Sequence, residues 1–426
     1  MKPILTIAAV FVAFFAFSQE PSYEQVLDKE ILSNAIENNE ESLGKPYVIM
    51  VSIDGFRYDY AEKFQAQNML DLAQSGSSAK WLIPSFPSKT FPNHYTLVTG
   101  LFPENHGIVS NSFYDKNQGK AYRIGEKNSV ENGAWYGGVP LWNLAQIQGM
   151  CAASYFWVGS EADINGMHPK YYYRYEKTTP YEYRVRRVLE WLQMPEKVRP
   201  HMLTLYFSLV DTQGHKFGPD AEETKAAVLH VDQQIGALRE GLKKLNLPVY
   251  LIVTADHGMD DVSEFINVRD YGVELERGQF YSGPVAMIYT KNEEETEAIY
   301  AKLAKQNLFK VYTRDAVPAY LHHNKNEKIG DLVLIADSPY TIIYSEKDLH
   351  KMEYPGGTHG YDPFENKNMG AIFYVEGPNV KKDFQISAIE NIHVYPLVAH
   401  LLGLKTITPI DGSFEAISQI LENEAH

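Results

Sequence analysis

The apolar positions of this chain gather in short unbroken runs, and three of these runs end in an aspartate. Residues 47–53 lead to Asp54, residues 202–210 lead to Asp211, and residues 249–255 lead to Asp256. Runs of this length, rich in Val, Ile, Leu and Tyr, predict strands buried on both faces, as in a parallel sheet under helices. Open α/β sheets bind ligands beyond the carboxyl ends of their strands. We therefore expect the three carboxylates to meet in one crevice.

Helical periodicity alternates with such runs along the chain. Helices are expected at residues 59–73, at residues 223–247 after a capping-box-like start, and at residues 392–402 before Gly403. Further strands are expected at residues 150–157, 284–289, 332–336 and 371–375. The alternation predicts an α/β fold with a mostly parallel central sheet and helices on both faces. Residues 105–140, rich in Gly, Asn and Tyr, are expected to form a loop-built wall of the active site.

Histidines accompany these aspartates. His215 comes four residues after Asp211, His257 directly follows Asp256, and His359 lies in a glycine-containing segment. Three carboxylates in a water-poor crevice repel one another unless cations are present. Three Asp and three His are enough ligands for two divalent ions, and mixed carboxylate and imidazole sets suit zinc. Three protein ligands for each ion leave positions open for a substrate.

The length and composition indicate a protein with a large core. The chain has 426 residues, of which 44% are hydrophobic, and a formal net charge of −15. This is compatible with one large α/β domain or two smaller ones. The negative charge argues against binding to a nucleic acid duplex. It does not exclude a small anionic ligand, because bound metal ions dominate the local field.

The N-terminus has the pattern of a secretory signal peptide. In residues 1–18, Lys2 is followed by an apolar stretch of about 14 residues and a plausible cleavage site before Gln19. This stretch is short for a membrane span, so no integral span is expected after cleavage. The only cysteine, Cys151, is far from the N-terminus, which excludes both a lipobox anchor and an internal disulfide. We expect a periplasmic or secreted protein, with an N-terminal arm at residues 19–43 and a single catalytic domain at residues 44–426.

A threonine between the first two aspartates has two interpretations. Thr90 precedes Phe91 and Pro92, and Pro is favoured in the first turn of a helix. Thr90 is therefore either a simple helix cap or a nucleophile at a helix N-terminus, where backbone N–H groups favour phosphoryl oxygens. A metal ion can activate such a hydroxyl without a basic residue. These residues alone leave both interpretations open.

Seven segments together resemble the nucleotide pyrophosphatase/phosphodiesterase family of the alkaline phosphatase superfamily. They occur in the family's order and spacing, and the resemblance extends over roughly residues 47–412. The segments are VSIDGFRYDY (51–60), PSKTFPNHYTLVTGLFPENHGIVSN (87–111), WVGSEADING (157–166), YFSLVDTQGHKFGP (206–219), TADHGM (254–259), KIGDLVLIAD (328–337) and GTHGYDP (357–363). The resemblance implies an alkaline-phosphatase-like fold and a metal site at the C-terminal strand ends.

The resemblance also implies a role for each site residue. It makes Thr90 the nucleophile, and it makes Asn111 a hydrogen-bond donor to a phosphoryl oxygen together with the Thr90 backbone N–H. One zinc would be held by Asp54, Asp256 and His257 with Thr90, and the second zinc by Asp211, His215 and His359. Phe91 and Tyr175 occupy positions where the family sandwiches a nucleobase. The implied activity is that of a phosphodiesterase I or nucleotide diphosphatase, which forms nucleoside 5′-monophosphates through a phosphothreonine with two Zn²⁺ ions per chain.

Four other functions are considered beside this one. A phosphate monoesterase of the same fold needs extra cations, but residues 156–166 contain Glu161 and Asp163 and neither Lys nor Arg. A choline-type phospholipid or glycerophosphodiester phosphodiesterase would need an aromatic and acidic cage. An inactive metal-binding module is disfavoured because the ligand types and Thr90 are all retained. A sulfatase is excluded, since its motif has Cys or Ser where this chain has Thr90.

Overall fold

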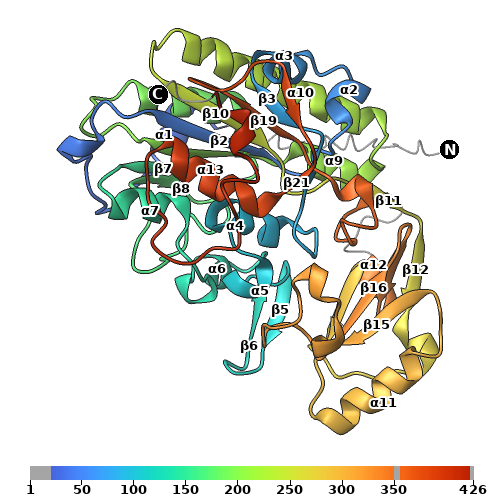
Figure 1. Ribbon diagram of the computed structural model, residues 1–426. Coiled ribbons are helices and arrows are strands. Elements are labelled where there is room, and N and C mark those ends of the chain that lie inside the picture. Colours follow the sequence, from blue (N-terminus) through green and yellow to red (C-terminus); the bar gives the residue numbers. More distant parts are fainter. Residues whose placement is uncertain (1–20, 350–355, 423–426) are drawn as a thin grey trace, which may run out of the picture.

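A nine-stranded sheet forms the centre of the computed structural model, which describes residues 21–349 and 356–422 (Figure 1). In spatial order the strands are β1 (Ile31–Leu32), β8 (Tyr171–Tyr173), β7 (Ala152–Tyr155), β9 (Met202–Phe207), β2 (Tyr47–Ile53), β10 (Val249–Thr254), β19 (Phe373–Glu376), β3 (Ser77–Ala79) and β20 (Phe384–Ile386). The run from β8 to β10 is parallel throughout. The expected mostly parallel α/β sheet is confirmed.

The three strands that lead to the aspartates are adjacent at the middle of this sheet. β2 is flanked by β9 and β10, and it pairs with both in parallel. Every residue of β2 is buried, as its unbroken apolar run predicts. The run at 202–210 was expected to be strand throughout, and this is wrong at its end. β9 stops at Phe207, and the helix α9 (Leu209–Phe217) begins before Asp211.

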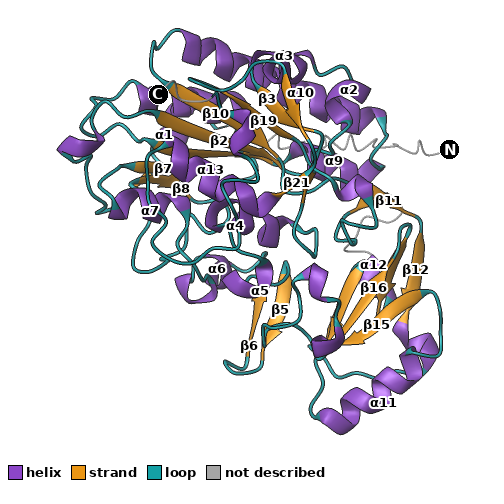
Figure 2. Cartoon of the chain, in the orientation of Figure 1, coloured by secondary structure: helices purple, strands orange, loops and turns teal. Residues whose placement is uncertain are grey.

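Helices cover both faces of the sheet (Figure 2). α3 (Gln67–Ser75), α8 (Tyr181–Leu192), α9 and α10 (Glu222–Lys243) pack together on one side. On the other side lie α4 (Thr90–Thr99), α7 (Leu141–Ile147) and α13 (Val394–Leu401). The single helix expected at 59–73 is instead two, α2 (Tyr60–Lys63) and α3, because Gln65 adopts φ +57° between them. The expected capping box of α10 is also absent, since its N-cap is Ala221.

A second, smaller sheet with its own helix forms an inserted layer between His257 and His359 in the sequence. Its four-stranded sheet has the order β13 (Phe280–Tyr281), β14 (Val285–Ile288), β16 (Leu332–Ala336), β15 (Phe309–Thr313), and α11 (Glu293–Leu303) packs on it. This sheet has a small hydrophobic core of its own. β12 (Glu264–Asn267) pairs with β17 (Tyr340–Ile343), and β11 (Asp260–Val262) pairs with β18 (Gly356–Thr358). The β11–β18 pair returns the chain to the main sheet just before His359.

Residues 105–140 contain more regular structure than the expected loop. The segment includes α5 (Pro103–His106), the hairpin of β5 (Ser112–Asp115) and β6 (Lys120–Arg123), and α6 (Lys127–Val130). The hairpin extends from the main body beside the inserted sheet (Figure 1). Remaining short elements are α1 (Tyr23–Leu27), β4 (Leu82–Ile83), α12 (Glu346–Leu349) and β21 (Ile389–Glu390).

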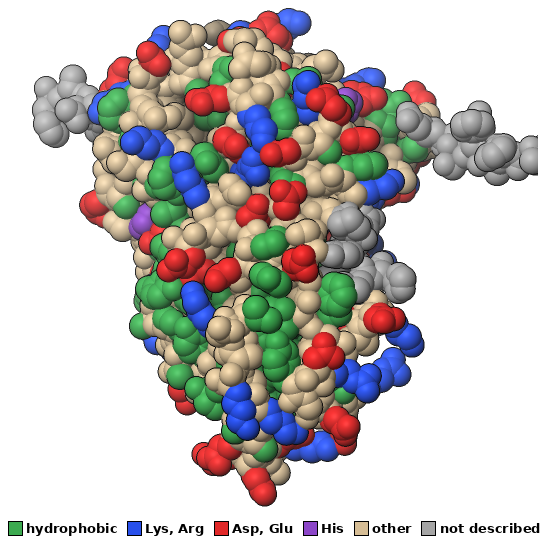
Figure 3. Space-filling view, turned by 90° about the vertical axis from the view of Figure 1, so that its right-hand side faces the viewer, with side chains coloured by type: hydrophobic (Ala, Val, Ile, Leu, Met, Phe, Trp, Pro, Cys, Tyr) green, Lys and Arg blue, Asp and Glu red, His purple; other side chains and the backbone are tan. Residues whose placement is uncertain are grey.

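The N-terminal predictions fall partly outside the described residues. The signal peptide at 1–18 lies there entirely, whereas residues 21–43 supply α1 and the edge strand β1. No helix of the described part has the length and apolar character needed to cross a membrane. Acidic and basic side chains are interspersed on the face shown in Figure 3, so the net negative charge is not concentrated in one patch there. The division into an arm and one catalytic domain at 44–426 stays a prediction.

Candidate active site and metal centre

Two of the aspartates are fixed by the ends of neighbouring strands. Asp54 directly follows β2, and its backbone N–H donates to Phe207 O at 2.9 Å. Asp256 lies just beyond β10, and its Oδ1 accepts the Gly55 N–H at 3.2 Å. Gly55 has φ +69°, and a Cβ atom there would lie 2.9 Å from Asp211 Cα. The turn after β2 therefore requires glycine to bring Asp54 against α9.

The first predicted ligand set meets in a fully buried cluster. Suitable ligand atoms of Asp54, Asp256 and His257 all lie within 4.8 Å of one another. His257 Nε2 is 2.9 Å from Asp256 Oδ2 and 3.5 Å from Asp54 Oδ1. The side chains of Asp256 and His257 are fully buried and that of Asp54 nearly so. The structure thus brings together all three residues of this set.

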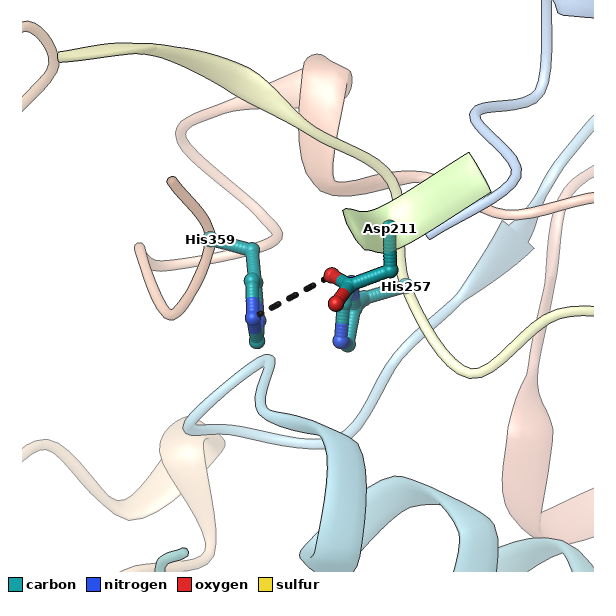
Figure 4. Close-up of side chains that lie close together, drawn as sticks. All are labelled: Asp211, His257 and His359. Carbon is teal, nitrogen blue, oxygen red and sulfur yellow. Dashed lines mark ion pairs between the residues drawn. The ribbon is translucent and has the colours of Figure 1, made fainter. Parts of the chain in front are cut away.

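The second set is built on α9 and on the segment after β18. Asp211 and His215 are one turn apart on α9, with Asp211 Oδ1 3.3 Å from His215 Nε2. His359 Nε2 lies 3.7 Å from the same oxygen (Figure 4). His257 is close enough to join a trio with Asp211 and His359, and its ring stacks on His359 with centroids 3.5 Å apart. The two sets are therefore contiguous, and the second is more open, since 18% of the Asp211 side chain is exposed.

Each of the three histidines has one ring nitrogen bonded to a backbone carbonyl. The Nδ1 atoms of His215, His257 and His359 lie 2.8 Å from Gly357 O, Gly258 O and Ser88 O, respectively. A nitrogen that donates to a carbonyl carries the ring proton, so in each neutral imidazole the lone pair is on Nε2. Such carbonyl contacts typically orient metal-ligating histidines. The three Nε2 atoms are the ones that face the carboxylates.

Burial and the close approach of the carboxyl and imidazole groups shift the pKa values of several residues in this cluster. Burial, together with the neighbouring charges of Asp256 and Asp211, raises the pKa of Asp54 well above its ordinary value. Burial opposes ionisation of Asp211 as well, but His215 and the other imidazoles outweigh it and lower its pKa to about 2. Burial and the two neighbouring imidazoles hold the pKa of His359 well below its usual value. In the absence of a cation, burial therefore favours the neutral forms of Asp54 and His359.

Three buried carboxylate oxygens without hydrogen-bond donors in the described part of the chain indicate that this cluster suits metal ions. Asp54 Oδ1, Asp211 Oδ1 and Asp256 Oδ2 are buried without a hydrogen-bond donor among the described residues. Leaving one such oxygen unpaired is costly, and leaving three beside one another is more so. Carboxylate oxygens and imidazole nitrogens are the donors that zinc accepts. The residues present therefore fit divalent metal ions, and the cluster is a candidate metal centre.

Thr90 is the first residue of α4, next to this centre. Its Oγ1 lies 3.2 Å from His257 Nε2. The N-cap is Lys89, so the simple capping role considered for Thr90 is not observed. The Phe91 N–H donates to Asn111 Oδ1 at 2.9 Å, which orients the Asn111 amide group. No acceptor for the Asn111 Nδ2 is found in the described part of the chain, and Phe91, which bonds the Asn111 Oδ1, directly follows Thr90.

Phe91 and Tyr175 line one cavity, with a volume of about 510 Å³, which also reaches Asp54, Thr90 and Asp211. Tyr175 is 45% exposed, and its ring makes edge contacts with Phe156 and Tyr206. An aromatic cavity that opens onto the hydroxyl and the carboxylates suits a flat group joined to a phosphate. A Tyr175 side chain that served only to pack the core would not be exposed to this extent.

The same cavity contains cations that lie outside the 156–166 segment. Arg174 and Lys127 line it, and each is paired with Glu131, at 3.0 Å and 3.5 Å. These two cations were not considered in the sequence argument against a monoesterase. Because the two carboxylates of Glu131 and Glu161 line the same cavity and balance both cations, that argument stays in place. Lys127 belongs to α6 and Arg174 to the segment after β8, so only the tertiary structure brings these two cations together.

Two further residues contact the ligands and were not identified from the sequence. Tyr206 donates its hydroxyl to Asp54 Oδ2 at 2.5 Å. His94 Nδ1 lies 2.9 Å from Thr90 O and 3.3 Å from Asp256 Oδ2, and its Nε2 lies 2.8 Å from Ser52 Oγ. The only indication of His94 in the sequence was its position four residues, or one helical turn, after Thr90. Tyr206 begins the family-like segment 206–219, but its place in an apolar run gave no indication of a role.

The doubly covered sheet, with carboxylates and imidazoles at the ends of its strands, defines an alkaline-phosphatase-like α/β protein. Comparison with known families then identifies one family within this class of fold. Residues 48–362 match the family described as type I phosphodiesterase / nucleotide pyrophosphatase. The chain belongs to this family.

Individual relatives agree with this assignment. The chain is 38% identical to a venom phosphodiesterase of Naja atra. The matched region covers 93% of this chain and 49% of that relative. It is 38% identical to ectonucleotide pyrophosphatase/phosphodiesterase family member 3 of Rattus norvegicus, over 90% of this chain and 45% of the relative. The chain thus spans about half the length of these curated relatives.

Solved structures of a further relative share the fold over its whole length. Murine ectonucleotide pyrophosphatase/phosphodiesterase 5 is 31% identical, with a TM-score of 0.81 over 88% of this chain and 100% of that one. An inactive threonine-to-alanine variant of that protein, in complex with AMP, is 30% identical, with a TM-score of 0.82 over 89% of this chain and 100% of that one.

Proposed function

We propose that this protein is a two-zinc phosphodiesterase and nucleotide pyrophosphatase. It hydrolyses nucleotide phosphodiester or phosphoanhydride bonds to nucleoside 5′-monophosphates through a phosphothreonine intermediate. One observation carries the proposal. Thr90 Oγ1 lies at the start of α4, 3.2 Å from His257 Nε2, in the same cavity as Phe91 and Tyr175. The residues proposed as nucleophile, metal ligands and base slot are thus neighbours, which supports the proposal.

The metal ligands divide into two sets. Asp54, Asp256 and His257 would hold one zinc with Thr90 Oγ1, and Asp211, His215 and His359 would hold the other. The three unpaired carboxylate oxygens and the three Nε2 atoms that face the carboxylates support this division. Bound zinc ions supply positive charge that lowers the pKa of a hydroxyl and stabilises a phosphoryl group.

The protein residues carry the rest of the reaction. Thr90 Oγ forms a bond to phosphorus while the bond from phosphorus to the leaving oxygen breaks, and the proton of Thr90 passes to solvent. Asn111 Nδ2, oriented by the bond from the Phe91 N–H to Asn111 Oδ1, donates to a non-bridging phosphoryl oxygen. The Thr90 backbone N–H at the helix start is a second donor. Water then attacks the phosphothreonine, breaks its P–Oγ bond, and releases the 5′-monophosphate.

The nucleoside is assigned to the aromatic cavity. Phe91 and Tyr175 would hold the base, since stacking on aromatic side chains is tolerant of base identity. The complex of a structural relative with AMP supports a nucleotide as the ligand class. The inactivity of its threonine-to-alanine variant supports a role for a threonine in this family. We further propose that the mature protein is periplasmic or secreted, which the names of its venom and ectoenzyme relatives support.

Hydrolysis by the zinc-loaded protein tests this function. The substrate is the p-nitrophenyl ester of thymidine 5′-monophosphate, and p-nitrophenyl phosphate is the monoester control. We expect the diester to be hydrolysed faster, chelation to abolish turnover, and zinc to restore it. The neutral donor Asn111 suits the single negative charge of a diester better than the two of a monoester. Faster hydrolysis of the monoester would contradict the diesterase assignment.

A further inference from the structure

A buried amide lies in the first turn of α4, just behind the hydroxyl of Thr90. Asn93 comes three residues after Thr90, and its side chain is completely buried. Side chains on a helix point back toward its N-terminus, so the Asn93 amide reaches the loop 85–89 that leads into α4. None of its atoms takes part in the proposed reaction. Its burial and its polarity therefore need another explanation.

The Asn93 amide bonds the backbone at both ends of this loop. Its Nδ2 lies 2.9 Å from Lys89 O, 3.1 Å from Pro87 O and 3.2 Å from Ser85 O. Its Oδ1 accepts the Ser85 N–H at 2.7 Å. The two hydrogens of the amide are thus shared among three carbonyls. One side chain supplies partners to a buried loop that forms no regular element of its own.

A second buried amide fixes the first. Asn391 Nδ2 donates to Asn93 Oδ1 at 2.8 Å, and Asn391 Oδ1 accepts the Ser85 hydroxyl at 2.8 Å. Asn391 begins the 3₁₀ helix Asn391–His393, which packs against α4. The Ser85 N–H can only donate, so its partner is the oxygen of Asn93 and the orientation of the amide is determined. A buried polar network in which each amide has partners is rigid.

The loop 85–89 also contacts the second ligand set. The Ser88 carbonyl accepts the Nδ1–H of His359 at 2.8 Å. Ser88 lies between the two residues whose carbonyls are closest to Asn93 Nδ2. The loop continues directly into Thr90 at the start of α4. A shift of the loop would therefore move the Thr90 hydroxyl and the backbone support of the His359 ring together.

We propose that Asn93 is a positioning residue, which holds the Thr90 hydroxyl and the His359 ring in place through the loop 85–89. This rests on the proposed function. Without the amide, the Ser85 N–H loses its acceptor and three carbonyls lose a donor, so the loop must shift to find new partners. A misplacement of about 1 Å can cost about a hundredfold in rate. Asn93 thus acts on the nucleophile and on one metal ligand without touching either.

The test compares Asn93→Ala with Asn38→Ala in the full chain. Asn38 is also buried, its Nδ2 donates to two backbone carbonyls, and its Oδ1 accepts a backbone N–H. These bonds lie near the starts of β7 and β9, whereas the metal centre is at the opposite ends of the strands. Both variants remove a bonded, buried amide. Both should therefore lower the urea midpoint for unfolding of the metal-free protein.

Zinc affinity separates a positioning role from a purely structural one. In competition with a chelator, one of the two zinc ions of Asn93→Ala should bind about 10–100-fold more weakly, because the His359 ring loses its fixed support. The zinc affinities of Asn38→Ala should equal those of the wild type. Asn93→Asp keeps the side-chain volume and an acceptor for the Ser85 N–H. It takes the place of Asn93→Ala if that variant does not fold, with the same expected loss.

Turnover of the zinc-loaded protein is the second measurement, with the p-nitrophenyl ester of thymidine 5′-monophosphate as substrate. The kcat of the Asn93 variant should fall about a hundredfold with KM nearly unchanged, since the aromatic cavity is intact. Wild-type kcat and zinc affinity in this variant, or equal losses in Asn38→Ala, would overturn the positioning role. Absence of hydrolysis by the wild type would instead end the proposed function, and zinc competition alone would then decide whether Asn93 supports His359.

Discussion

Tyr206 donates its hydroxyl to Asp54 Oδ2 at 2.5 Å, and Asp54 Oδ1 is left buried without a donor. The bond fixes the orientation of a carboxylate whose other oxygen faces His257. Tyr206 also lines the aromatic cavity, where its ring contacts Tyr175. One side chain therefore connects the proposed base slot to the proposed metal centre.

Tyr206→Phe should weaken zinc binding while the fold stays intact. Loss of a partner that orients a ligand typically costs about 10–100-fold in metal affinity. Competition with a chelator, followed by metal analysis, measures the change. Tyr250→Phe is the matched control, because Tyr250 is also buried and its hydroxyl bonds Asn379 far from the site. Equal zinc affinity in both variants would show that Tyr206 does not position Asp54.

Thr90→Ala should remove turnover and keep both metals. Thr90 supplies the nucleophile, whereas the six Asp and His ligands remain. We expect turnover to fall by more than about a hundredfold, or about 2.7 kcal/mol of barrier. Thr90→Ser should recover part of the activity, since it retains a hydroxyl at the start of α4. Turnover of Thr90→Ala within about tenfold of wild type would end the covalent mechanism.

His215→Ala should remove one metal and leave the other. His215 lies beside Asp211 on the more open side of the centre, while the first set is fully buried around His257. Elemental analysis is expected to change from two zinc ions per chain to one. His257→Ala, by contrast, should weaken both sites, because His257 is within reach of both clusters. A His215→Ala protein that retains two zinc ions, or retains none, would contradict the division of ligands.

Tyr175→Ala should lower efficiency on nucleotides more than on a small aryl diester. Base stacking on an aromatic ring contributes about 1–3 kcal/mol, and bis-p-nitrophenyl phosphate has no base. The readout is kcat/KM on ATP and on that aryl diester. Tyr175→Phe keeps the ring and removes only the hydroxyl, which donates to Ser208 at 3.3 Å, so it should resemble the wild type. Equal losses on both substrates would mean that Tyr175 supports the fold rather than the base.

Acid should destabilise the protein through buried histidines. His323 is completely buried, and burial lowers its pKa to about 3 from 6.5. The unfolded chain then binds more protons than the folded one between pH 6.5 and about 3, so stability falls as the pH falls through this window. Each pH unit costs about 1.4 kcal/mol per group, and His106 adds a similar effect, since burial also lowers its pKa to about 3.

His323→Phe isolates this contribution. Neither ring nitrogen of His323 has a hydrogen-bond partner among the described residues, so an aromatic hydrocarbon should be tolerated there. The free energy of unfolding, from denaturant titrations at pH 7 and pH 5, should fall less on acidification in the variant than in the wild type. The difference is expected to be about 2 kcal/mol over the 1.5 units below pH 6.5. Identical falls would exclude His323 as an acid-labile group.

Local patterns in the sequence determined the elements that carry the chemistry. The apolar runs predicted β2 and β10 together with the aspartate after each. Asp211 and His215 are four residues apart in the sequence, but the helix α9 that carries both was not predicted. The division of six ligands into two sets came from the family resemblance rather than from spacing. The strands β2 and β10 and the aspartate after each depend on residues close together in the chain, so a short segment contains the information.

Only the tertiary structure decided which distant residues meet. His359 lies beside His257 although about 100 residues separate them in the sequence. The pairing of β11 with β18 at the base of the insertion brings them together. Parallel packing of β2 against β9 directs Tyr206 to Asp54, and no pattern along β9 distinguishes that tyrosine from a core residue. Side-chain periodicity is a property of one segment, whereas such contacts follow from how segments pack.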